Sequence, residues 1–532
     1  MKTVPLRTLL LTAITLVPLV SKADGTQPNA IEVTEYRVEG VRTLPAIEVE
    51  KTVYPYLGPA RTSDDVEKAR AALEKAYQDK GYKTVSVVIP AQKVENGIVT
   101  LQVIEGKVGR LRVRGSQYSD LDEIKKGAPS LAEGKTPDFD AVQRDIVALN
   151  KSADRQVTPE IKAGAEPGTI DVDLVVKDKP ALHGSLEFNN RHNADTEPLR
   201  INGALHYDNL WQLGHSIGGN FQVAPQQPDN AQVYSAFYTA KGVGFDWLDL
   251  TLSGTKSYSN VNTIGNVNVN GPGETVGLRA TATLPGKESY FHTFSAGIDY
   301  KHSKQDIGIP GSPAINAPIS YFPMSAEYSA TKFWADGSLT QFNLGVTWHF
   351  DGVGDNAADF ENRRAGARAD FAYFRGDISH TQELPGAMQL WAQLQAQAAS
   401  GPLVSNEQFG IGGLTTVRGY LESEAIGDNA LAFSAELRSP NLTCDGALDE
   451  WRVYGFVDWG GSTVSRPAAG QQSRFELASV GIGTRLKFAD HFSASADLGV
   501  PLADGPRTAE GNVNTGILAG SPFVTFTLKA EF

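Results

Sequence analysis

The fold class is decided by the last ten residues of the chain, Phe523-Val524-Thr525-Phe526-Thr527-Leu528-Lys529-Ala530-Glu531-Phe532. Every second side chain from Val524 to Phe532 is apolar, and the side chains between them carry hydroxyl or charged groups. Successive side chains of a strand point to opposite faces, so this stretch has one face suited to lipid and one suited to water.

The same alternation recurs upstream. After residue 181 we count about sixteen runs of roughly nine to thirteen residues, the length that a tilted strand needs to cross a bilayer. The clearest runs are 216–223, 248–253, 342–350, 388–395 and 431–438. A soluble β-sandwich also has alternating strands. These strands are too long and too many for one sandwich.

The connectors between the runs also alternate in length. Those at 209–213 and 242–244 are short, whereas those at 257–273, 304–319 and 401–427 are long. Short turns on one side and long loops on the other are typical of porins, and a closed barrel satisfies its backbone in lipid because it has no open edge. We therefore predict an all-β transmembrane barrel of about 16 antiparallel strands over residues 181–532.

Residues 31–178 have a different pattern, with a weak internal repeat. The stretch 31–40 ends in Arg-Val-Glu-Gly and the stretch 108–115 ends in Arg-Val-Arg-Gly. Helical periodicity follows each copy, at 63–80 and at about 139–151, and two strands follow each helix. The pattern predicts two α+β units, 31–106 and 107–178, each with helices on one sheet face and a free sheet edge.

The N-terminus has the features of a secretory signal peptide. Lys2 and Arg7 precede an apolar run, Leu9 to Val20, and small residues flank a cleavage position after Ala23. An uncleaved anchor is the alternative. Cleavage would leave a short segment, residues 24–30, before the first strand. This segment has no cysteine to which a lipid could be attached, so we do not expect a lipoprotein.

Composition excludes several classes of protein. The formal net charge of −13 argues against a general nucleic-acid binder, and the single cysteine, Cys444, excludes a disulfide framework or an iron–sulfur cluster. After residue 23 no apolar run approaches the length of a membrane helix. No HExxH motif occurs, and the glycine run 410–413 lacks the Gly-Lys-Ser/Thr ending of a P-loop. We expect no catalytic residue, metal or cofactor.

Two short motifs stand out. The longest loop contains Val417-Arg418-Gly419-Tyr420, and a later strand contains Phe456-Val457-Asp458-Trp459-Gly460. Alternation puts Asp458 on the face opposite Trp459, so Asp458 faces the lumen if Trp459 faces lipid. If Asp458 is buried there, its carboxylate needs a cation as partner. The alternative is that Asp458 is solvated in the lumen and Arg418 lies in a simple solvated turn, in which case the two side chains never meet.

These motifs carry a resemblance. The first resembles the Val-Arg-Gly-Tyr/Phe motif of the BamA-like superfamily, and the second resembles its Phe-x-Asp-x-Gly strand motif. With two POTRA-like repeats, about sixteen strands and a terminal Phe, the chain is similar to two-partner secretion transporters of the haemolysin secretion/activation family, the ShlB/FhaC/HecB type. The resemblance implies that a loop of about 400–428 folds back into the barrel. It also implies a lock between loop and barrel, formed by Val417, Arg418, Gly419, Tyr420, Phe456, Asp458 and Gly460.

The resemblance also implies a location, partners and a function. The barrel would lie in the outer membrane with its POTRA domains in the periplasm, and Phe526, Leu528 and Phe532 would form the signal read by the barrel assembly machinery. The POTRA domains would capture a large unfolded exoprotein and the lumen would conduct it to the cell surface without ATP. The alternatives are a factor that inserts other barrels, which usually carries more POTRA units, and a passive porin, which needs none.

One departure from the resemblance concerns a plug. Many members of the family place a helix before the first POTRA domain, and that helix plugs the barrel. Residues 24–30 leave no room for such a helix and its linker, so we do not expect this chain to plug itself in that way.

Overall fold

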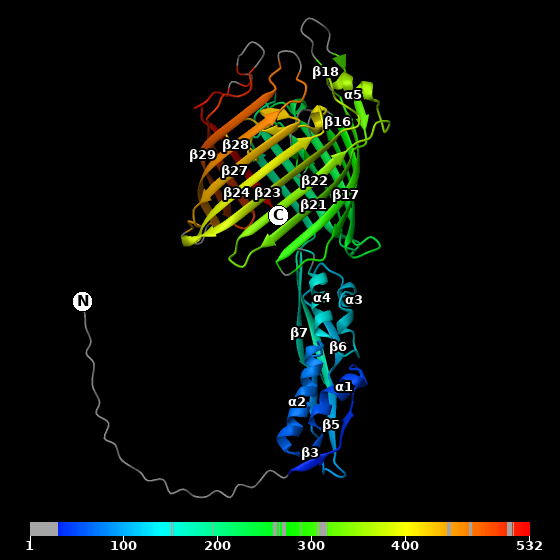
Figure 1. Cartoon of the computed structure of the whole chain (residues 1–532). Helices are drawn as coiled ribbons and strands as arrows, with labels where there is room; N and C mark the ends of the chain where they lie inside the picture. The colour runs from blue at the N-terminus through cyan, green and yellow to red at the C-terminus, as the bar shows by residue number, and fades with distance from the viewer. Residues whose placement is uncertain are drawn as a thin grey trace, which may run out of the picture. The chain divides into compact units, whose positions relative to one another are not determined.

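A computed structural model of the chain divides into two compact units (Figure 1). The first unit ends at Lys179 and the second begins at Pro180. The structure describes residues 30–532 apart from short gaps at 151, 153, 195, 259–262, 265–266, 269–272, 288, 305, 308–314, 317, 444–447, 468–470, 508–512, 514 and 516. The predicted signal peptide and Cys444 lie outside the described residues.

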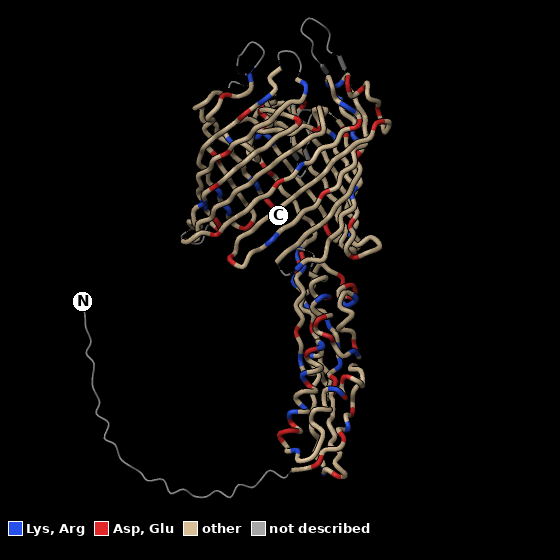
Figure 2. Tube along the Cα trace, viewed as in Figure 1, with Lys and Arg blue, Asp and Glu red and all other residues tan. Residues whose placement is uncertain are grey.

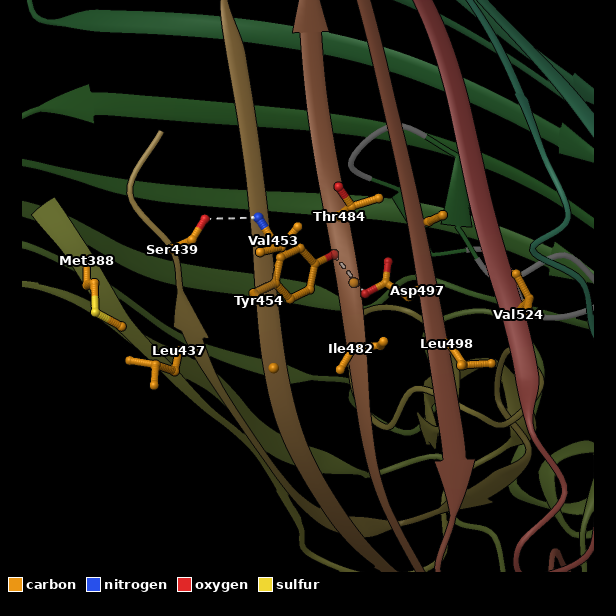
Figure 3. Close-up of a pocket in the computed structure, with 13 residues that line it drawn as sticks. Met388, Leu437, Ser439, Val453, Tyr454, Ile482, Thr484, Asp497, Leu498 and Val524 are labelled. Carbon is orange, nitrogen blue, oxygen red and sulfur yellow. Dashed lines mark hydrogen bonds between the residues drawn. The ribbon is translucent and has the colours of Figure 1, made fainter. Parts of the chain in front are cut away.

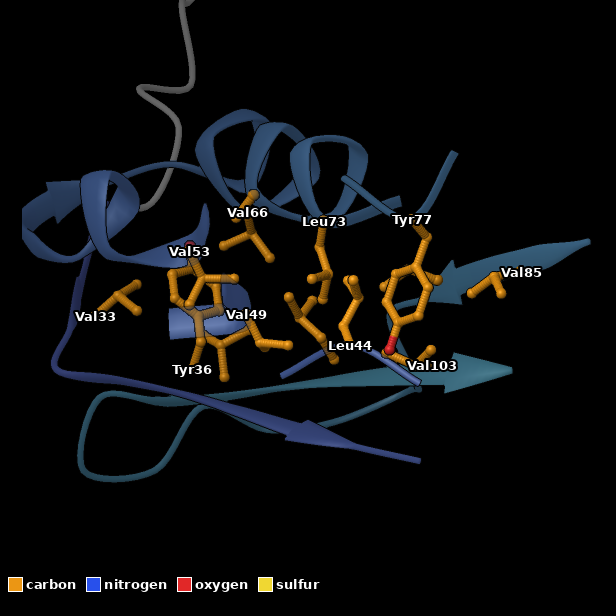
Figure 4. Close-up of a cluster of buried hydrophobic side chains, with 14 residues drawn as sticks. Val33, Tyr36, Leu44, Val49, Val53, Val66, Leu73, Tyr77, Val85 and Val103 are labelled. Carbon is orange, nitrogen blue, oxygen red and sulfur yellow. The ribbon is translucent and has the colours of Figure 1, made fainter. Parts of the chain in front are cut away.

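The first half of the N-terminal unit is an α+β fold around one three-stranded sheet. Its strands lie in the order β2 (Glu35–Glu39), β5 (Ile98–Glu105) and β4 (Val85–Val88), with β2 parallel and β4 antiparallel to β5. Two helices supply the buried apolar layer over the sheet, α1 (Ala46–Val53) and α2 (Ser63–Asp79). Figure 4 shows this core, in which Leu73 and Tyr77 of α2 are fully buried.

Local sequence explains where α2 begins. The Thr62 hydroxyl accepts a hydrogen bond from the Asp65 amide, and the Asp65 carboxylate accepts one from the Thr62 amide, which completes a capping box. The helix expected at 63–80 is therefore confirmed. A two-stranded pair, β1 (Ile31–Val33) with β3 (Gly58–Arg61), and a short 3-10 turn η1 (Tyr54–Tyr56) complete this half.

The second half of the N-terminal unit repeats the arrangement. Its strands lie in the order β6 (Lys107–Arg114), β8 (Thr169–Asp178) and β7 (Arg155–Ala163). The helical segments are α3 (Leu121–Lys126), η2 (Pro129–Leu131) and α4 (Phe139–Leu149). The repeated sequence Arg-Val-x-Gly thus ends the strand that lies parallel to the central strand of each sheet.

The second unit is a closed antiparallel barrel of sixteen strands. One of the sixteen is interrupted, because β20 (Ile319–Tyr321) and β21 (Met324–Phe333) both pair with β17 (Tyr290–Ser303). The others are β9 (Leu182–Asn189), β10 (Arg200–Leu210), β11 (His215–Val223), β12 (Gln232–Ala240), β13 (Leu248–Ser257), β16 (Gly273–Thr283), β22 (Leu339–Trp348), β23 (Ala372–Leu384), β24 (Met388–Ala399), β27 (Asn429–Arg438), β28 (Glu450–Thr463), β29 (Arg474–Phe488), β30 (Phe492–Pro501) and β31 (Phe523–Glu531).

The first and last strands of the second unit pair with each other and close the barrel. Strand β31 pairs with β9, and the Phe532 and Gly184 backbones exchange two hydrogen bonds of 3.0 Å. The alternation in β31 has the expected result: Val524, Leu528 and Phe532 are 51%, 51% and 67% exposed on the outer face, whereas Thr525 is 6% exposed inside. Figure 2 marks the acidic and basic residues along the barrel strands.

Other elements lie in the connectors. The connector 349–371 contains a short helix, α5 (Ala357–Arg363), which sequence periodicity did not reveal. Three small strand pairs lie in the long loops recognised from the sequence. They are β14 (Thr263–Ile264) with β15 (Val267–Asn268), β18 (Asp306–Ile307) with β19 (Ile315–Asn316), and β25 (Phe409–Ile411) with β26 (Ala425–Gly427). Among the described residues, no helix is long and apolar enough to cross a membrane.

Candidate functional site: a loop fixed inside the barrel

The connector between β24 and β27, residues 400–428, packs on the inner wall of the barrel. Its side chains Ile411, Val417 and Tyr420 are at most 1% exposed. They form one apolar cluster with Ala432 of β27 and Leu477 of β29. The neighbours of these strand residues in sequence, such as Leu431, are exposed on the outer face, so the loop lies on the lumenal side.

Arg418 and Asp458 are in direct contact. The Arg418 Nε and Nη2 atoms each donate to one oxygen of the Asp458 carboxylate at 2.8 Å, which is a bidentate pair. The Arg418 backbone amide donates to the same carboxylate at 3.0 Å. Both residues are at most 4% exposed. Trp459 is 39% exposed on the outer face, so Asp458 points inward, as alternation suggested.

Arg418 has further partners that the sequence motifs did not identify. Its Nη1 atom donates to Glu436 of β27 at 2.6 Å and to Asp497 of β30 at 3.5 Å, and its Nη2 atom donates to the Ser434 hydroxyl at 3.0 Å. The guanidinium carbon lies 3.6 Å from the centroid of the Phe456 ring, which is a cation–π contact. The alternating pattern of β27 could place Glu436 inside, but only the register places it beside Arg418.

The positive and negative charges around Arg418 balance. Glu436 also accepts from Arg438 at 2.7 Å and from Arg485 at 3.0 Å, so three carboxylates face three guanidinium groups. Figure 3 shows the neighbouring contact in which the Tyr454 hydroxyl donates to Asp497 at 2.8 Å. Since the carboxylates are neutralised by side chains of the chain itself, the cluster is suited to holding a loop rather than a metal ion.

Glycines allow the loop to approach the wall. A Cβ on Gly499 of β30 would lie 2.6 Å from the Gly419 nitrogen, and a Cβ on Gly460 would lie 2.9 Å from a Val417 methyl carbon. Gly419 also has a φ of 89°, which favours glycine. Tyr420 does not stack on the ion pair; its hydroxyl bonds to the carbonyls of Ala478 at 3.0 Å and Ala503 at 2.7 Å.

A second anchor, absent from the sequence prediction, holds the end of the loop. Asp428 is fully buried and accepts from both terminal nitrogens of Arg364, which follows α5, at 2.5 and 2.8 Å. The same carboxylate accepts from the backbone amides of Leu403 at 2.8 Å and Ser465 at 2.7 Å. We call this set, Asp428 with Arg364, Leu403 and Ser465, the root latch.

The start of the loop is fixed in a similar way. Glu407 is 1% exposed and accepts from Lys301 of β17 at 2.7 Å. It also accepts from the hydroxyls of Tyr321 at 2.6 Å and Tyr373 at 2.8 Å. Both flanks of the in-folded loop are therefore held by buried carboxylates.

A further contact joins the loop to the segment after β9. The Arg191 Nε atom donates to Glu422 at 2.8 Å, and the Glu422 amide donates to the His192 carbonyl at 3.0 Å. The Asn190 side chain bonds to the Val524 carbonyl and to the Phe526 amide, both at 2.8 Å. The loop thus reaches the part of the wall where the first and last strands meet.

The three terminal residues singled out from the sequence lie at that seam and not in the lock. Phe526 packs near Phe188 of β9, with ring centroids 5.8 Å apart, and Leu528 lies on the same outer face. A Cβ on Gly184 would overlap the Phe532 ring, with a closest approach of 2.2 Å, so that glycine makes room for the terminal aromatic side chain.

Comparisons with known proteins identify the family. Residues 168–486 match the model of the haemolysin secretion/activation protein family ShlB/FhaC/HecB, and residues 31–106 match the ShlB-type POTRA domain. The chain is 21% identical over 502 residues to the outer membrane transporter CdiB of Escherichia coli O6:K15:H31, covering 92% of this chain and 82% of that protein. It is 21% identical over 483 residues to the heme/hemopexin transporter protein HuxB of Haemophilus influenzae strain Rd, covering 86% and 80%.

Solved structures agree in fold. CdiB from Escherichia coli superimposes with a TM-score of 0.65 at 18% identity, covering 97% of this chain and 93% of that one. BamA from Haemophilus ducreyi lacking POTRA domains 1–3 gives a TM-score of 0.54 at 14% identity, covering 94% and 100%. The chain belongs to the haemolysin secretion/activation family of two-partner secretion transporters in the outer membrane, which is not a family of enzymes.

Proposed function

We propose that this family member passes a large unfolded exoprotein from the periplasm to the cell surface, with the N-terminal unit capturing it and the barrel lumen conducting it. The observation that carries this proposal is that one chain contains both two α+β domains with sheet edges and a barrel whose inner face is polar. A passive solute pore needs no such domains.

The inner wall suits an extended polypeptide. Along β11 and β13 the side chains that alternate with exposed Ile217, Phe221 and Leu252 point into the lumen and are small and polar. They include Ser216, Asn220, Thr251, Ser253 and Thr255, with the single charged side chain Asp249 on the same face of β13. Most of these side chains offer hydrogen bonds without charge, which suits passage of a segment of varied sequence. The chain carries no P-loop, and folding of the exported protein outside the cell would supply the energy without ATP.

We assign parts of the chain to roles on this basis. Residues 31–106 and 107–178 are two POTRA domains, and residues 1–23 are a signal peptide removed before residues 24–30. The loop of about 400–428 is held in the lumen by Val417, Arg418, Gly419 and Tyr420 against Phe456, Asp458 and Gly460. The terminal strand, with Phe526, Leu528 and Phe532, is the signal for the barrel assembly machinery during insertion into lipid.

The alternative function is insertion of other barrels into the outer membrane. Likeness to BamA supports the fold alone, because identity is 14%. Two POTRA domains match the exporters of the family, whereas insertion factors usually carry more. Loss of many barrel proteins from the outer membrane after deletion of this gene would favour the alternative, and loss of one secreted protein would favour export.

Removal of residues 24–178 tests capture and conduction separately. The signal peptide is kept and fused to Lys179, and we expect secretion of the dependent exoprotein to fall below a tenth of the intact level while the barrel still inserts. Secretion is measured in the culture medium, and insertion is measured by the mobility shift of the unheated barrel on a gel. Undiminished secretion by the truncated chain, at equal barrel level, would contradict the capture role.

A further inference from the structure

Two histidines and an aspartate lie together on β9 and β10, away from the in-folded loop and its anchors. His183 of β9 is the direct cross-strand partner of His206 of β10, and Asp208 follows His206 by two residues. Residues two apart in a strand share a face, and direct partners on neighbouring strands have adjacent side chains. The three side chains therefore lie side by side on one face of a two-stranded ribbon.

That face is the inner face of the barrel. Leu205 and Tyr207, on either side of His206, are 53% and 41% exposed on the outer face. Alternation therefore directs His206 and Asp208 inward, and His183 with them. The side chains of His206 and Asp208 are 39% and 28% exposed, so a dissolved ion can reach them from the lumen.

The nitrogen and oxygen atoms of the three side chains are close enough to share one ion. The His206 Nδ1 atom lies 3.1 Å from the Asp208 Oδ2 atom. A ring nitrogen of His183 lies within 4.8 Å of a carboxylate oxygen of Asp208, and the two imidazole rings have centroids 5.1 Å apart.

These distances match those of a zinc site before the ion binds. Two ligands that are each about 2.0–2.1 Å from a tetrahedral zinc ion are about 3.3 Å apart. The pair of His206 and Asp208 already has that spacing. A turn of the His183 side chain brings its nitrogen into the same range.

The backbone around the three side chains holds them in place. The Asp208 amide donates to the Ala181 carbonyl at 2.8 Å, which fixes the carboxylate to the start of β9. On the other side of β10, the partner of His206 is Gly218 of β11, on which a Cβ would lie only 2.7 Å from the His206 Cβ. Any larger residue at position 218 would displace His206.

The chemistry of the three groups suits a transition metal. Imidazole nitrogens and a carboxylate oxygen are ligands that zinc takes in sites with three protein ligands, where water fills the fourth position. We expected no metal from the sequence because it contains no local ligand motif. Here the register of β9 against β10 brings the ligands together, so no spacing along the chain marks them.

We propose that His183, His206 and Asp208 form a binding site for a divalent transition metal ion such as zinc. The ion takes the place of the proton that the His206 Nδ1 atom donates to Asp208, and this proton is released to water. Because the ligands come from two strands, the bound ion joins the start of β9 to β10. The site does not depend on which protein the barrel exports.

Isothermal titration calorimetry with zinc tests the site on the full chain. The chain carries no histidine tag, is purified in detergent and is freed of metal with a chelator. We expect one zinc ion to bind per chain, and at least tenfold weaker binding in His183→Gln and in His206→Gln. The control is His215→Gln, on the outer face of β11, where the Nδ1 atom lies 2.7 Å from the Tyr238 hydroxyl. It should bind zinc within twofold of the unchanged chain.

Hydrogen exchange measures the link between the two strands. Zinc should slow exchange at the amides of residues 182–186 by at least threefold in the unchanged chain, and should have no effect there in His206→Gln. The mobility shift of the unheated barrel on a gel shows whether each variant is folded. If a glutamine variant does not fold, Asp208→Asn takes its place, since it keeps the size of the side chain and removes the charge. We expect Asp208→Asn to bind zinc at least tenfold more weakly.

Two results would overturn the site. One is zinc binding within twofold of the unchanged chain in the folded double variant His183→Gln/His206→Gln, or in Asp208→Asn where it replaces that variant, because the ion would then bind elsewhere. The other is a lack of zinc binding by the unchanged chain.

Discussion

Arg418 connects three strands through its single guanidinium group, because its carboxylate partners Asp458, Glu436 and Asp497 come from β28, β27 and β30. Taking such charges out of water is costly, and only mutual pairing offsets that cost. The cation therefore positions the loop at one place on the wall and holds it there.

Replacing members of the pair should give unequal losses. Arg418→Ala takes a cation away from three buried carboxylates and should destabilise the in-folded loop by about 3–5 kcal/mol. Asp458→Ala leaves Arg418 bonded to Glu436 and should destabilise the loop less. Arg418→Lys should restore little, because lysine cannot form the forked contact. A double-mutant cycle on secretion rate measures the coupling. Strictly additive defects would show that the two residues act independently.

Asp178, at the end of β8 in the N-terminal unit and outside the membrane-spanning barrel, makes the stability of that unit depend on pH. Burial raises the pKa of its carboxyl, but hydrogen bonds from the amides of residues 117–119 and the Ser116 hydroxyl outweigh burial and hold that pKa at about 2. Because the folded pKa lies below the ordinary value of 3.8, the stabilisation is complete above about pH 4 and is lost as the pH falls towards 2.

We expect Asp178→Asn to speed hydrogen exchange at the amides of residues 117–119 at pH 6 by at least tenfold. The difference from the unchanged chain should shrink as the pH approaches 2, which mass spectrometry at corrected intrinsic rates can follow. Glu160→Gln, an exposed carboxylate on β7 in the same sheet, is the matched control. Equal protection in both variants at pH 6 would contradict the role of Asp178.

At the scale of elements, the loop 400–428 is held inside at Arg418 and at its flanks by Glu407 and Asp428. The root latch joins three connectors, because Arg364 lies after α5, Asp428 at the end of the loop and Ser465 after β28. A long loop in water has a large entropy to lose, so attachment at one point would leave its flanks free to move.

Asp428→Ala should loosen the loop although the residue lies outside both sequence motifs. It leaves Arg364 without its carboxylate partner and the backbone amides of Leu403 and Ser465 without an acceptor, which should destabilise the in-folded loop by about 3–5 kcal/mol. The control is Asp370→Ala, since Asp370 pairs with Arg368 on the same connector at the exposed surface, where a pair contributes about 0–1 kcal/mol. Protease cleavage within residues 400–428 of the folded barrel is the measurement. Equal cleavage in the two variants would show that the root latch does not hold the loop.

For the whole molecule, we expect the two units to unfold separately. Each half of the N-terminal unit has a small core, whereas the barrel strands are hydrogen-bonded on both sides around a closed ring. All seven tryptophans lie beyond residue 180, from Trp211 to Trp459, so their fluorescence reports the barrel alone. In a urea titration, the helical circular dichroism signal should be lost at a lower urea concentration than the one at which tryptophan fluorescence changes. A single coincident transition would contradict this expectation.

The sequence by itself determined the classes of element and their order. The period-two pattern of β31 and its relatives set the strands and their outer faces, and Thr62 with Asp65 set the start of α2, because local sterics and hydrogen bonding act within a few residues. It did not reveal α5, which has a capping box of Asn356 and Asp359 at its start but is only seven residues long. Its Phe360 packs against Tyr321 and Phe371, which are brought to it by the fold.

The motifs also pointed to Arg418 and Asp458, but only the tertiary structure decided what surrounds them. Glu436, Asp497, Glu407 and Asp428 are each separated in sequence from a partner by a strand or more, and barrel register sets which side chains meet across the lumen. The same holds for the outer strands of the N-terminal sheets, where folding brings the Glu74 carboxylate to the Val87 amide and the Asn150 side chain to the Val157 backbone. Contacts of that kind depend on long-range pairing, which a local pattern of residues does not encode.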